Sequence, residues 1–450
     1  MDDTITALAT PLSNGAISII RVSGKDAINI VSKIFDKDLT NKNSHTITYG
    51  HIVNNNEIID EVLVMLFRAP KTYTREDVVE INCHGGVYTT KKTLELLLNN
   101  GCRMAEKGEF TKRAFLNGRI NLLEAEAVED LVSATSDASR AMAINNVDGN
   151  LTKKIENIRE KIVKILANIE VNIDYPEYTD ELEVTNNLMK KYTDEIAPVL
   201  DDLVKNSKNG RMIKNGVNVA LIGLPNVGKS SILNHLLDEE KAIVTDIPGT
   251  TRDIVEGRIS LNGVAINFID TAGIRVSNDV VEKIGIDKSK KTADNADIVI
   301  LVLNNDKNIS NEEKELLEKY NKDNLIIFVN KTDLNKVISI PDNLLSKTVY
   351  GNTISLDGLN DLKSKISEVL ELDEIVNNDM SYLSNLRQID LVTKAKEALD
   401  SAKTSLNDGM SVDIIEIDLR ESWELLGELI GESYQDELVD NIFKNFCLGK

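Results

Sequence analysis

The segment Gly223–Ser230, with the sequence GLPNVGKS, decides the fold. It fits the phosphate-binding pattern in which a glycine is followed by any four residues, then Gly-Lys, then Ser or Thr. It directly follows the apolar run Val217–Ile222, which is typical of a buried parallel strand, and it precedes a helical pattern. Glycines there let backbone N–H groups surround phosphates, Lys229 adds positive charge, and the Ser230 hydroxyl suits magnesium. The loop predicts nucleotide binding on an α/β fold and leaves ATP and GTP both open.

Two further motifs follow apolar strands later in the chain and select the nucleotide. Asp270–Gly273 (DTAG) comes after Val264–Ile269, where its aspartate can reach the magnesium shell and the Gly273 N–H can sense the γ-phosphate. Asn330–Asp333 (NKTD) comes after Leu325–Val329, and its aspartate suits the N1 and N2 groups of guanine. Because the three motifs occur in order, each at the end of a strand, the sequence predicts GTP.

Two weaker segments fit the same domain. Thr250–Asp253 (TTRD) lies between the first two motifs and resembles a mobile first switch, in which Thr251 closes on magnesium; an ordinary Gly-Thr turn is the alternative. Ser355 occupies the place of a fifth guanine-contact motif that usually reads Ser-Ala-x, although Leu356 replaces the alanine. Both segments are predicted to line the nucleotide site.

The residue after DTAG is informative because Ras-type GTPases use a glutamine there to orient the attacking water. Here it is Ile274, which has no polar side-chain atom, so hydrolysis needs another group. The candidates are Arg275 and Glu282 in the second switch, and Asn226 in the phosphate loop, where a bound monovalent cation can replace an arginine finger. The alternative for Glu282 is a solvated charge on a helix surface.

Outside this domain the hydrophobic periodicity changes. Residues 1–118 alternate short β-type runs with Gly, Pro and Asn turns, which predicts a compact α+β domain. Residues 119–213 and 372–450 carry apolar residues at three-four spacing, which is typical of long amphipathic helices. We expect these two parts to pack together as a helical bundle, so that the α/β P-loop domain of residues 214–371 is an insertion into one helical domain.

Composition limits the classes of protein and the kinds of site to which this chain can belong. The chain has 450 residues, of which 42% are hydrophobic, and its longest apolar runs are too short to span a membrane. The net charge of −21 opposes a broad phosphate-binding surface, so another protein would have to hold much of any bound RNA. The acidic start, Met1–Thr4, lacks a secretion signal and favours the cytoplasm. Cys83, Cys102 and Cys447 match neither a disulfide framework nor a zinc site.

Several segments together resemble the MnmE family, also called TrmE, of bacterial tRNA-modification GTPases. In the central domain they are the phosphate loop, Thr245–Asp253 and Asp270–Arg275. Elsewhere they are Asp3–Ile5, Ile19–Gly24, Cys83–Gly86, Gly108–Arg119 and the closing Cys447–Lys450. The resemblance covers the whole chain, and Leu448 replaces the isoleucine of the family's usual Cys-Ile-Gly-Lys ending.

The resemblance implies an N-terminal domain that dimerises and binds a tetrahydrofolate derivative, in its 5-formyl or 5,10-methylene form. The implied folate contacts are Arg21, Glu80, Arg119 and Lys450. Cationic groups suit the glutamate tail of folate and a carboxylate can pair with its 2-amino pyrimidine edge, yet each residue taken singly is better explained as an exposed salt bridge. Cys447 matches the family's terminal cysteine and is a candidate functional thiol.

In the G domain the resemblance implies a set of ligands and catalytic groups. Potassium is expected at Asn226, Thr245, Ile247 and Thr250, magnesium at Ser230 and Thr251, and catalysis by Glu282, Lys229 and Thr251. The GTP-binding residues are then Asn226, Val227, Gly228, Lys229, Ser230, Ser231, Thr245, Asp246, Ile247, Pro248, Gly249, Thr250, Thr251, Asp270, Thr271, Ala272, Gly273, Asn330, Lys331, Asp333 and Ser355.

The family acts with a partner, MnmG, which carries FAD and uses NADH. The resemblance therefore implies a homodimer that joins MnmG in a heterotetramer or larger complex. That complex adds an aminomethyl or carboxymethylaminomethyl group to C5 of the wobble uridine of certain tRNAs, with the one-carbon unit coming from folate. Two alternatives stay open: a ribosome-assembly-type regulatory GTPase without one-carbon chemistry, which the G motifs alone allow equally, and a helical scaffold with GTP as a structural ligand.

Overall fold

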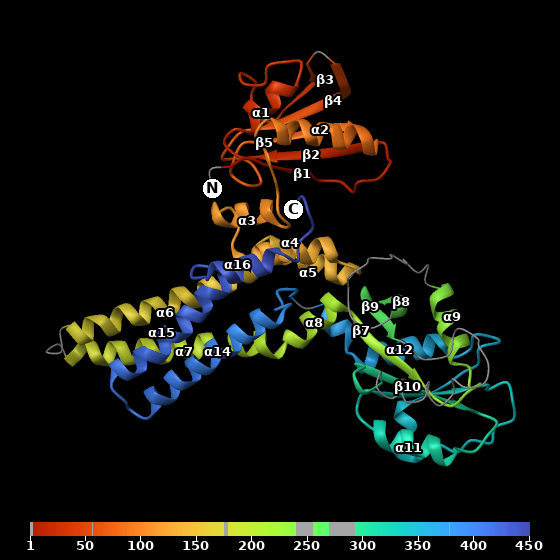
Figure 1. The fold of residues 1–450 in the computed structure, drawn as a ribbon. Helices are drawn as coiled ribbons and strands as arrows, with labels where there is room; N and C mark the ends of the chain where they lie inside the picture. Colours follow the sequence, from red (N-terminus) through yellow and green to blue (C-terminus); the bar gives the residue numbers. More distant parts are fainter. Residues whose placement is uncertain (1–2, 56, 175–178, 240–254, 270–292, 378) are drawn as a thin grey trace. The chain divides into compact units, whose positions relative to one another are not determined.

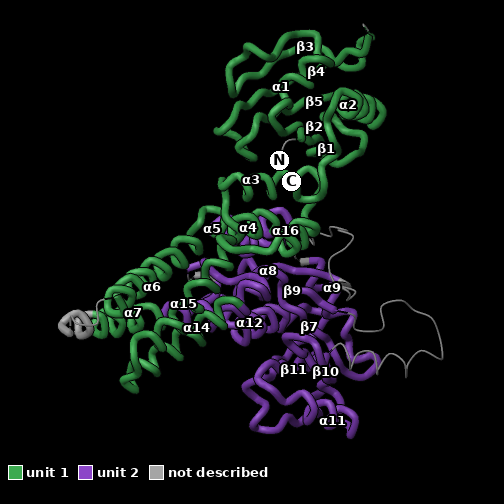
Figure 2. Tube along the Cα trace, turned by 60° about the vertical axis from the view of Figure 1, so that its left-hand side comes forward, with its two compact units in different colours: residues 1–129, 146–197, 391–450 green, residues 130–145, 198–390 purple. Residues whose placement is uncertain are grey.

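The computed structural model describes residues 3–55, 57–174, 179–239, 255–269, 293–377 and 379–450 (Figure 1). The chain divides into two compact units, which Figure 2 distinguishes by colour. Unit one comprises residues 1–129, 146–197 and 391–450, and unit two comprises residues 130–145 and 198–390. Each unit is therefore built from segments that lie far apart in the sequence.

Unit one begins with a mixed sheet whose six described strands have the order β3-β4-β5-β2-β1-β6. Their bounds are β1 Ile5–Leu8, β2 Ile17–Ser23, β3 Thr46–Asn54, β4 Glu57–Phe67, β5 Val78–His84 and β6 Arg103–Met104. Neighbouring strands are antiparallel except for β1 and β6, which are parallel. The sheet and its helices confirm the α+β class predicted for this part of the chain.

The two faces of this sheet are covered differently, because alternate side chains of each strand point to opposite sides. Helices α1 (Ala27–Ile34) and α2 (Val87–Asn99) bury one face in an apolar core. On the other face, Phe110 of helix α3 (Glu109–Leu116) packs against Ile5 and Ala7 of β1. Over β3 and β4 the side chains on that second face, which we call the open face, include Ile47, Tyr49 and Leu63, which are exposed by 62%, 52% and 45%.

The helices of unit one include segments from both ends of the chain. Their bounds are α4 Leu122–Ser133, α6 Asn150–Asp174, α7 Thr179–Lys205, α14 Leu386–Asn407, α15 Val412–Ile430 and α16 Asp436–Phe443, of which α4, α7 and α14 continue into unit two. Helix α6 packs against α15, and Lys403 of α14 pairs with Asp194 of α7 at 2.6 Å. The apolar three-four repeat of α6 is fully buried from Ile155 to Ile169. Helices before and after the inserted segment thus pack together, as predicted.

Unit two contains a second sheet, in the order β12-β11-β10-β7-β9-β8. The strands are β7 Val217–Ile222, β8 Val255–Leu261, β9 Val264–Ile269, β10 Ile298–Asn304, β11 Leu325–Asn330 and β12 Thr348–Tyr350. The helices are α8 Ser207–Asn215, α9 Lys229–Glu239, α11 Asn311–Tyr320, the 3₁₀ helix η1 Asp342–Lys347, α12 Leu359–Val369 and α13 Leu372–Asn377. The predicted runs Val217–Ile222 and Val264–Ile269 match β7 and β9 at both ends.

One strand of this sheet departs from the parallel arrangement that the apolar runs predicted. Strand β8 is antiparallel to β9, while the other neighbouring pairs are parallel. The two strands are joined at Asn262 and Gly263, whose φ angles of +50° and +80° suit a tight hairpin turn. Periodicity alone does not reveal direction, because a strand buried on both faces reads as an apolar run in either orientation.

The hairpin turn also contacts a helix that precedes it by more than a hundred residues in the sequence. The N–H of Ala138, in helix α5 (Asp137–Val147), donates to the carbonyl oxygen of Gly263 at 2.9 Å. Ala138 and Met142 are buried in the same apolar core as the strands of the second sheet. Residues 137–145 of helix α5 therefore belong to unit two, a placement that helical periodicity by itself does not disclose.

Candidate functional site

The phosphate loop predicted from the sequence lies between β7 and α9, at the carboxyl end of a central strand. Both of its glycines are required by the backbone conformation. Gly223 has φ +145°, and a Cβ there would lie 2.5 Å from the carbonyl oxygen of Val302. Gly228 has φ +101°, and a Cβ would lie 2.2 Å from Nδ2 of Asn330. The loop is thus a tight backbone turn into which only glycine fits at these positions.

Lys229 is the charged group of this loop. Its Nζ donates hydrogen bonds to the carbonyl oxygens of Gly223 at 2.8 Å and Leu224 at 3.0 Å, so the side chain folds back over the loop. Burial lowers the pKa of Lys229, because an ammonium group is disfavoured away from water. A phosphate group would compensate that charge. Ser230 and Ser231, in the first turn of α9, are exposed and available to ligands.

The guanine motif is attached directly to the phosphate loop. Asn330, at the end of β11, is 1% exposed, and its Nδ2 donates to the carbonyl oxygen of Val227 at 2.8 Å. Its Oδ1 is buried and accepts no hydrogen bond from the described residues. Lys331 has φ +64°, and its Nζ donates to the carbonyl oxygen of Asn226 at 3.0 Å. Asp333 is exposed, as a group that reads a base must be.

The predicted fifth motif is a turn next to the guanine motif. The side-chain oxygen of Asn352 accepts hydrogen bonds from the N–H groups of Ile354 at 2.9 Å and Ser355 at 2.7 Å. Leu356, which replaces the usual alanine, has φ +64° and is 38% exposed. The N–H of Thr332 donates to the carbonyl oxygen of Gly351 at 3.2 Å. This turn and the NKTD segment are therefore adjacent, and Asn352 is an organising residue that sequence reasoning missed.

Other predicted residues of the nucleotide site fall outside the described part of the chain. They are the switch segment Thr245–Thr251, the DTAG motif Asp270–Gly273, and Glu282, together with Ile274 and Arg275. The positions expected to bind potassium at Thr245, Ile247 and Thr250, and magnesium at Thr251, are among them. The described half of the site thus comprises the phosphate loop and the guanine-side motifs.

A second group of predicted residues lies in unit one, on the open face of its sheet. Arg21 on β2 is opposite Glu80 on β5, and its Nε donates to the Glu80 carboxylate at 2.8 Å. The Arg21 guanidinium lies over the Phe110 ring, with Cζ 5.7 Å from the ring centroid. Its Nη1 donates to the carbonyl oxygen of Gly449 at 3.1 Å. One arginine therefore contacts the sheet, helix α3 and the end of the chain.

The last residues of the chain are held against the start of α3. The Phe110 N–H donates to the Lys450 carbonyl oxygen at 3.1 Å, and the Gly108 N–H to the Cys447 carbonyl oxygen at 3.4 Å. Gly449 has φ +88°, and a Cβ there would lie 2.2 Å from the carbonyl oxygen of Leu8. The segment Cys447–Lys450, which we call the tail, is thus packed closely against the sheet.

Arg119 lies beyond the other end of α3. Its Cζ is 4.6 Å from the centroid of the Tyr73 ring, and the Tyr73 hydroxyl is 2.9 Å from Oγ1 of Thr111. Tyr73 packs against the cluster that contains Phe110. The structure therefore brings Arg21, Glu80 and the tail together and attaches Arg119 to the same apolar cluster through Tyr73. Sequence reasoning missed both rings; Phe110 lies inside the quoted Gly108–Arg119 segment, whereas no motif signalled Tyr73.

The three cysteines differ in their exposure to solvent. Cys83 and Cys102 are buried, and burial raises the pKa of each thiol to about 12. Such thiols are poor nucleophiles at neutral pH. Cys447 is free and exposed in the tail. Within the described ranges, no group of His, Cys, Asp and Glu side chains could hold a metal ion.

Comparison with known proteins finds similarity along nearly the whole chain. Residues 4–119 match the family model described as the GTP-binding protein TrmE N-terminus, and residues 122–447 match the MnmE helical domain. A protein of Streptococcus thermophilus, named tRNA modification GTPase MnmE, is 50% identical over all of this chain and 98% of its own length. A Streptococcus mutans protein of the same name is 49% identical over 100% of this chain and 99% of its own length.

Among solved structures, the G domain of the T. maritima FeoB iron transporter is 32% identical over 34% of this chain and 98% of its own, with a TM-score of 0.25. No helix among the described residues has the length and apolar character that a membrane crossing requires. The two family models together span nearly the whole sequence, and the full-length relatives are about half identical to it. The chain belongs to the MnmE (TrmE) family.

Proposed function

We propose that this chain hydrolyses GTP to GDP and phosphate and that the reaction serves a tRNA modification. One observation carries the proposal: the phosphate loop after β7 is hydrogen-bonded to the buried Asn330 of the guanine motif, so the groups for phosphate and base form one site. The unpartnered Oδ1 of Asn330, the glycine-only turn and the half-buried Lys229 all fit a bound guanine nucleotide. The family's name agrees with this activity.

The proposed roles in hydrolysis follow from chemistry at the loop. Lys229 would neutralise the β- and γ-phosphates, and Ser230 with Thr251 would hold magnesium. Asn226 is exposed, with φ +63°, and together with Thr245, Ile247 and Thr250 it would bind potassium, which supplies positive charge near the β/γ bridge. Glu282 would orient the attacking water. In Ras-type GTPases a glutamine does this, and Ile274 occupies its position here.

We propose that the second site binds a tetrahydrofolate derivative, in the 5-formyl or 5,10-methylene form. The donor set fits such a molecule. The Glu80 carboxylate, which pairs with Arg21, suits a 2-amino pyrimidine edge, and Arg21, Arg119 and Lys450 suit the glutamate tail. The Phe110 ring lies next to the Arg21 guanidinium. The folate would supply the one-carbon unit. Cys447 lies in the same tail as Lys450 and remains a candidate thiol for this site.

The open face favours a second copy of the chain as a partner. Its apolar side chains Ile47, Tyr49 and Leu63 are about half exposed or more on β3 and β4, next to the Arg21–Glu80 pair on β2 and β5. Contiguous exposed apolar surface of this kind typically marks a protein interface. We propose that the homodimer forms through this face, so that the N-terminal domains of the two copies contact each other.

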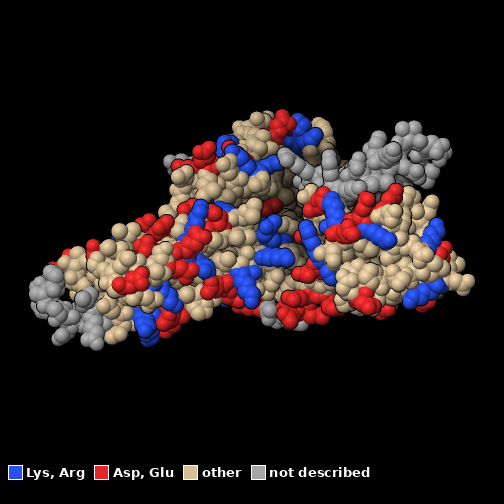
Figure 3. All heavy atoms as spheres, turned by 90° about the horizontal axis from the view of Figure 1, so that it is seen from below, with Lys and Arg blue, Asp and Glu red and all other residues tan. Residues whose placement is uncertain are grey.

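The wider assembly would include MnmG, with its FAD and NADH, and a tRNA whose wobble uridine is modified at C5 to the aminomethyl or carboxymethylaminomethyl form. Figure 3 shows basic and acidic side chains interspersed over the face drawn. With a net charge of −21, this pattern supports a complex, a heterotetramer or larger, in which MnmG provides much of the tRNA-binding surface. We place the complex in the cytoplasm.

The proposed domains keep the boundaries derived from the sequence. They are an N-terminal folate-binding and dimerisation domain (1–118), a helical domain in two parts (119–213 and 372–450), and an inserted G domain (214–371). Residues 130–145 of the first helical part pack in unit two, where Ala138 and Met142 share the apolar core of the second sheet.

The test of the GTPase mechanism is GTP turnover in potassium chloride against sodium chloride at equal ionic strength, with Asn226→Ala beside the wild type. Potassium activation that the variant loses is the expected result. Equal rates in both salts would remove the cation-assisted mechanism. A parallel titration with 5-formyltetrahydrofolate separates the two GTPase classes, because a ribosome-assembly-type GTPase has no reason to bind folate. Tight, salt-sensitive tRNA binding by this chain alone would refute the proposed role of MnmG.

A further inference from the structure

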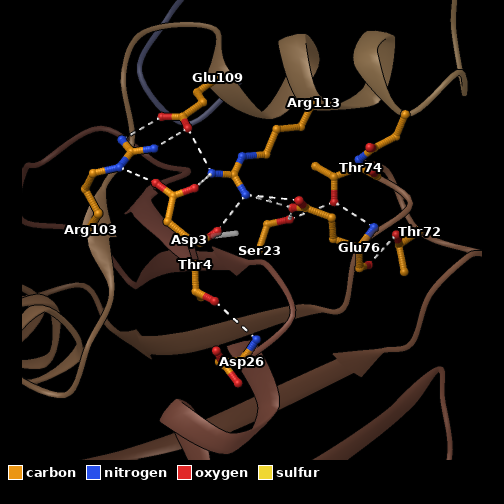
Figure 4. Close-up of polar contacts among 11 residues, drawn as sticks. Asp3, Thr4, Ser23, Asp26, Thr72, Thr74, Glu76, Arg103, Glu109 and Arg113 are labelled. Atoms are coloured by element: carbon orange, nitrogen blue, oxygen red, sulfur yellow. Dashed lines mark hydrogen bonds and ion pairs between the residues drawn. The ribbon is translucent and has the colours of Figure 1, made fainter. Parts of the chain in front are cut away.

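Helix α3 carries a buried arginine whose surroundings the folate proposal does not use. Arg113 is 1% exposed, and its guanidinium pairs with three carboxylates (Figure 4). Nη2 is 2.8 Å from Oδ1 of Asp3 and 3.0 Å from Oε1 of Glu109, and Nη1 is 3.0 Å from Oε1 of Glu76. Nη1 also donates to the carbonyl oxygen of Asp3 at 2.9 Å. Such a group is held in one position from several directions.

The three carboxylates belong to three different segments of the fold. Asp3 precedes β1, Glu76 lies in the loop before β5, and Glu109 begins α3. A second arginine strengthens the arrangement, since Arg103 of β6 donates to Asp3 at 2.6 Å and to Glu109 at 3.0 Å. A shift of α3 along the sheet would break these pairs. It would be unfavourable, because the buried charge of Arg113 would then lack compensation.

Helix α3 connects the two ends of the proposed folate site. At its start, Gly108 and Phe110 hold the tail that ends in Lys450. After its end, the chain reaches Arg119, which stacks on Tyr73. By contrast, Arg21 and Glu80 belong to the strands of the sheet. Half of the proposed site is thus carried by the sheet and half depends on where α3 lies.

The loop that contains Glu76 is also fastened to the end of α3. The Asn117 side chain donates to the Thr74 carbonyl oxygen at 2.6 Å, and Arg75 donates to the Asn117 carbonyl oxygen at 2.9 Å. Ser23 of β2 is hydrogen-bonded to Glu76 at 2.7 Å. The Arg113 cluster, which we define as Asp3, Glu76, Arg103, Glu109 and Arg113, therefore links sheet, loop and helix at one point.

We propose that Arg113 is a positioning residue for the folate site: it fixes α3 against the sheet and so sets Arg119 and Lys450 at the right distance from Arg21 and Glu80. The inference rests on the proposed folate function. Arg113 is too deeply buried to contact a ligand, so it acts on affinity only through the residues that α3 carries.

The experiment is a mutant cycle in the full-length chain, with the dissociation constant for 5-formyltetrahydrofolate measured by calorimetry. Arg113→Lys keeps the charge but cannot make the same forked contacts, and we expect it to weaken binding about tenfold. In a background of Arg119→Ala with Lys450→Ala, the same change should weaken binding less than about twofold, because the residues it positions are gone. In a Glu80→Gln background the tenfold effect should persist.

Two controls separate positioning from general stability. GTP turnover should be unchanged in Arg113→Lys, because unit two carries the phosphate loop. Arg258→Lys is the matched control, since Arg258 is a half-buried arginine of unit two that donates to Asn267 at 2.7 Å. It should leave folate binding unchanged. If Arg113→Lys does not fold, Glu76→Gln enters the same cycle, because it removes one carboxylate and leaves Asp3 and Glu109 in place.

The outcomes are distinct. Arg113→Lys that lowers the melting temperature but leaves the folate dissociation constant unchanged would overturn the positioning role while the folate proposal stands. An undiminished tenfold effect in the Arg119→Ala, Lys450→Ala background would also overturn it, because Arg113 would then act on the fold as a whole. A wild-type chain that is folded and hydrolyses GTP but does not bind 5-formyltetrahydrofolate would reject the folate proposal itself and the inference with it.

Discussion

The phosphate loop of unit two and the Arg21 site of unit one are built in opposite ways. In the loop, the glycines, Lys229 and Ser230 belong to one short stretch, and the described long-range support comes from Asn330 and Lys331. In unit one, the proposed ligand residues are spread from Arg21 on β2 to Lys450 at the end of the chain. The first site is local in sequence, and the second is assembled by the fold.

The difference has a physical origin. Phosphate binding uses backbone N–H groups and one ammonium group, so a short turn of fixed conformation contains nearly all of the chemistry. A ligand with a flat ring and a distant anionic tail has two ends that are far apart. It needs binding groups at both ends, and only separate secondary-structure elements can provide them. Local sites are therefore vulnerable to changes within the motif, and assembled sites are vulnerable to changes in the packing that joins their parts.

The largest effect is expected from removing the charge of the local site. Lys229→Ala should lower GTP turnover by at least ~10²–10³-fold, because one well-placed electrostatic group is worth that much in a buried site. Phosphate release in potassium chloride measures it. Folate binding by the same variant should be unchanged. A turnover within tenfold of the wild type would mean that the loop is not the reacting site.

A smaller effect tests the shape of the loop. Gly228→Ala should weaken guanine-nucleotide binding about tenfold or more, because the new Cβ would lie 2.2 Å from Asn330 and the residue would keep φ +101°. Binding of a fluorescent GDP analogue gives the dissociation constant. Gly409→Ala is the matched control, since Gly409 has φ +71° but nothing within 4 Å of its Cβ position. Equal affinities for both variants would show that the contact with Asn330 is unimportant.

The assembled site should respond to a change far from its motif. Gly449→Ala should weaken folate binding about tenfold, because a Cβ 2.2 Å from the Leu8 carbonyl oxygen displaces the tail and Lys450 with it. GTP turnover should stay at the wild-type rate. Calorimetry with 5-formyltetrahydrofolate is the measurement, again with Gly409→Ala as control. Unchanged folate affinity would show that the tail is not part of the site.

Acid should destabilise the Arg113 cluster, which supports the assembled site. Burial opposes ionisation of Asp3 and Glu109, but the hydrogen bonds and charges of Arg103 and Arg113 outweigh it and hold the pKa of both carboxyl groups below the ordinary value. Folded-state pKa values below the unfolded ones give stability that is present above about pH 4 and is lost as the pH falls. The melting temperature should therefore fall more steeply below about pH 4 in the wild type than in Glu109→Gln. Parallel curves would contradict this.

The smallest effect concerns the edge of the open face. His84 is hydrogen-bonded to Asp60 at 2.7 Å, and this bond raises the pKa of the imidazole. The contribution of the pair to stability is thus present below about pH 6.5 and is lost as the pH rises through the folded-state value. Proton NMR titration should give a His84 pKa above that of Asp60→Asn. An identical pKa in the two proteins would remove the pair as an electrostatic contact.

The elements that sequence predicted best are those with a short-range cause. Val217–Ile222 and Val264–Ile269 are strands at the expected residues, because continuous apolar runs bounded by glycine and polar turns have few alternatives. The antiparallel direction of β8 and the place of α5 were not readable, since both depend on which surface a segment meets. Tyr73 and Asn352 were missed for the same reason, because neither belongs to a motif. Tyr73 acts by contacting Arg119, and Asn352 by accepting hydrogen bonds from the turn that contains Ser355.

The sequence by itself determined the phosphate loop, the guanine motif and the family, because spacing within a few residues specifies a backbone turn and the groups on it. Only the tertiary structure decided that Arg21 reaches the Gly449 carbonyl oxygen and that Arg113 meets Asp3, Glu76 and Glu109. Those contacts require β2, α3 and the tail to converge in space. That convergence is set by the burial of apolar surface such as Phe110 and Phe443, which acts without regard to distance along the chain.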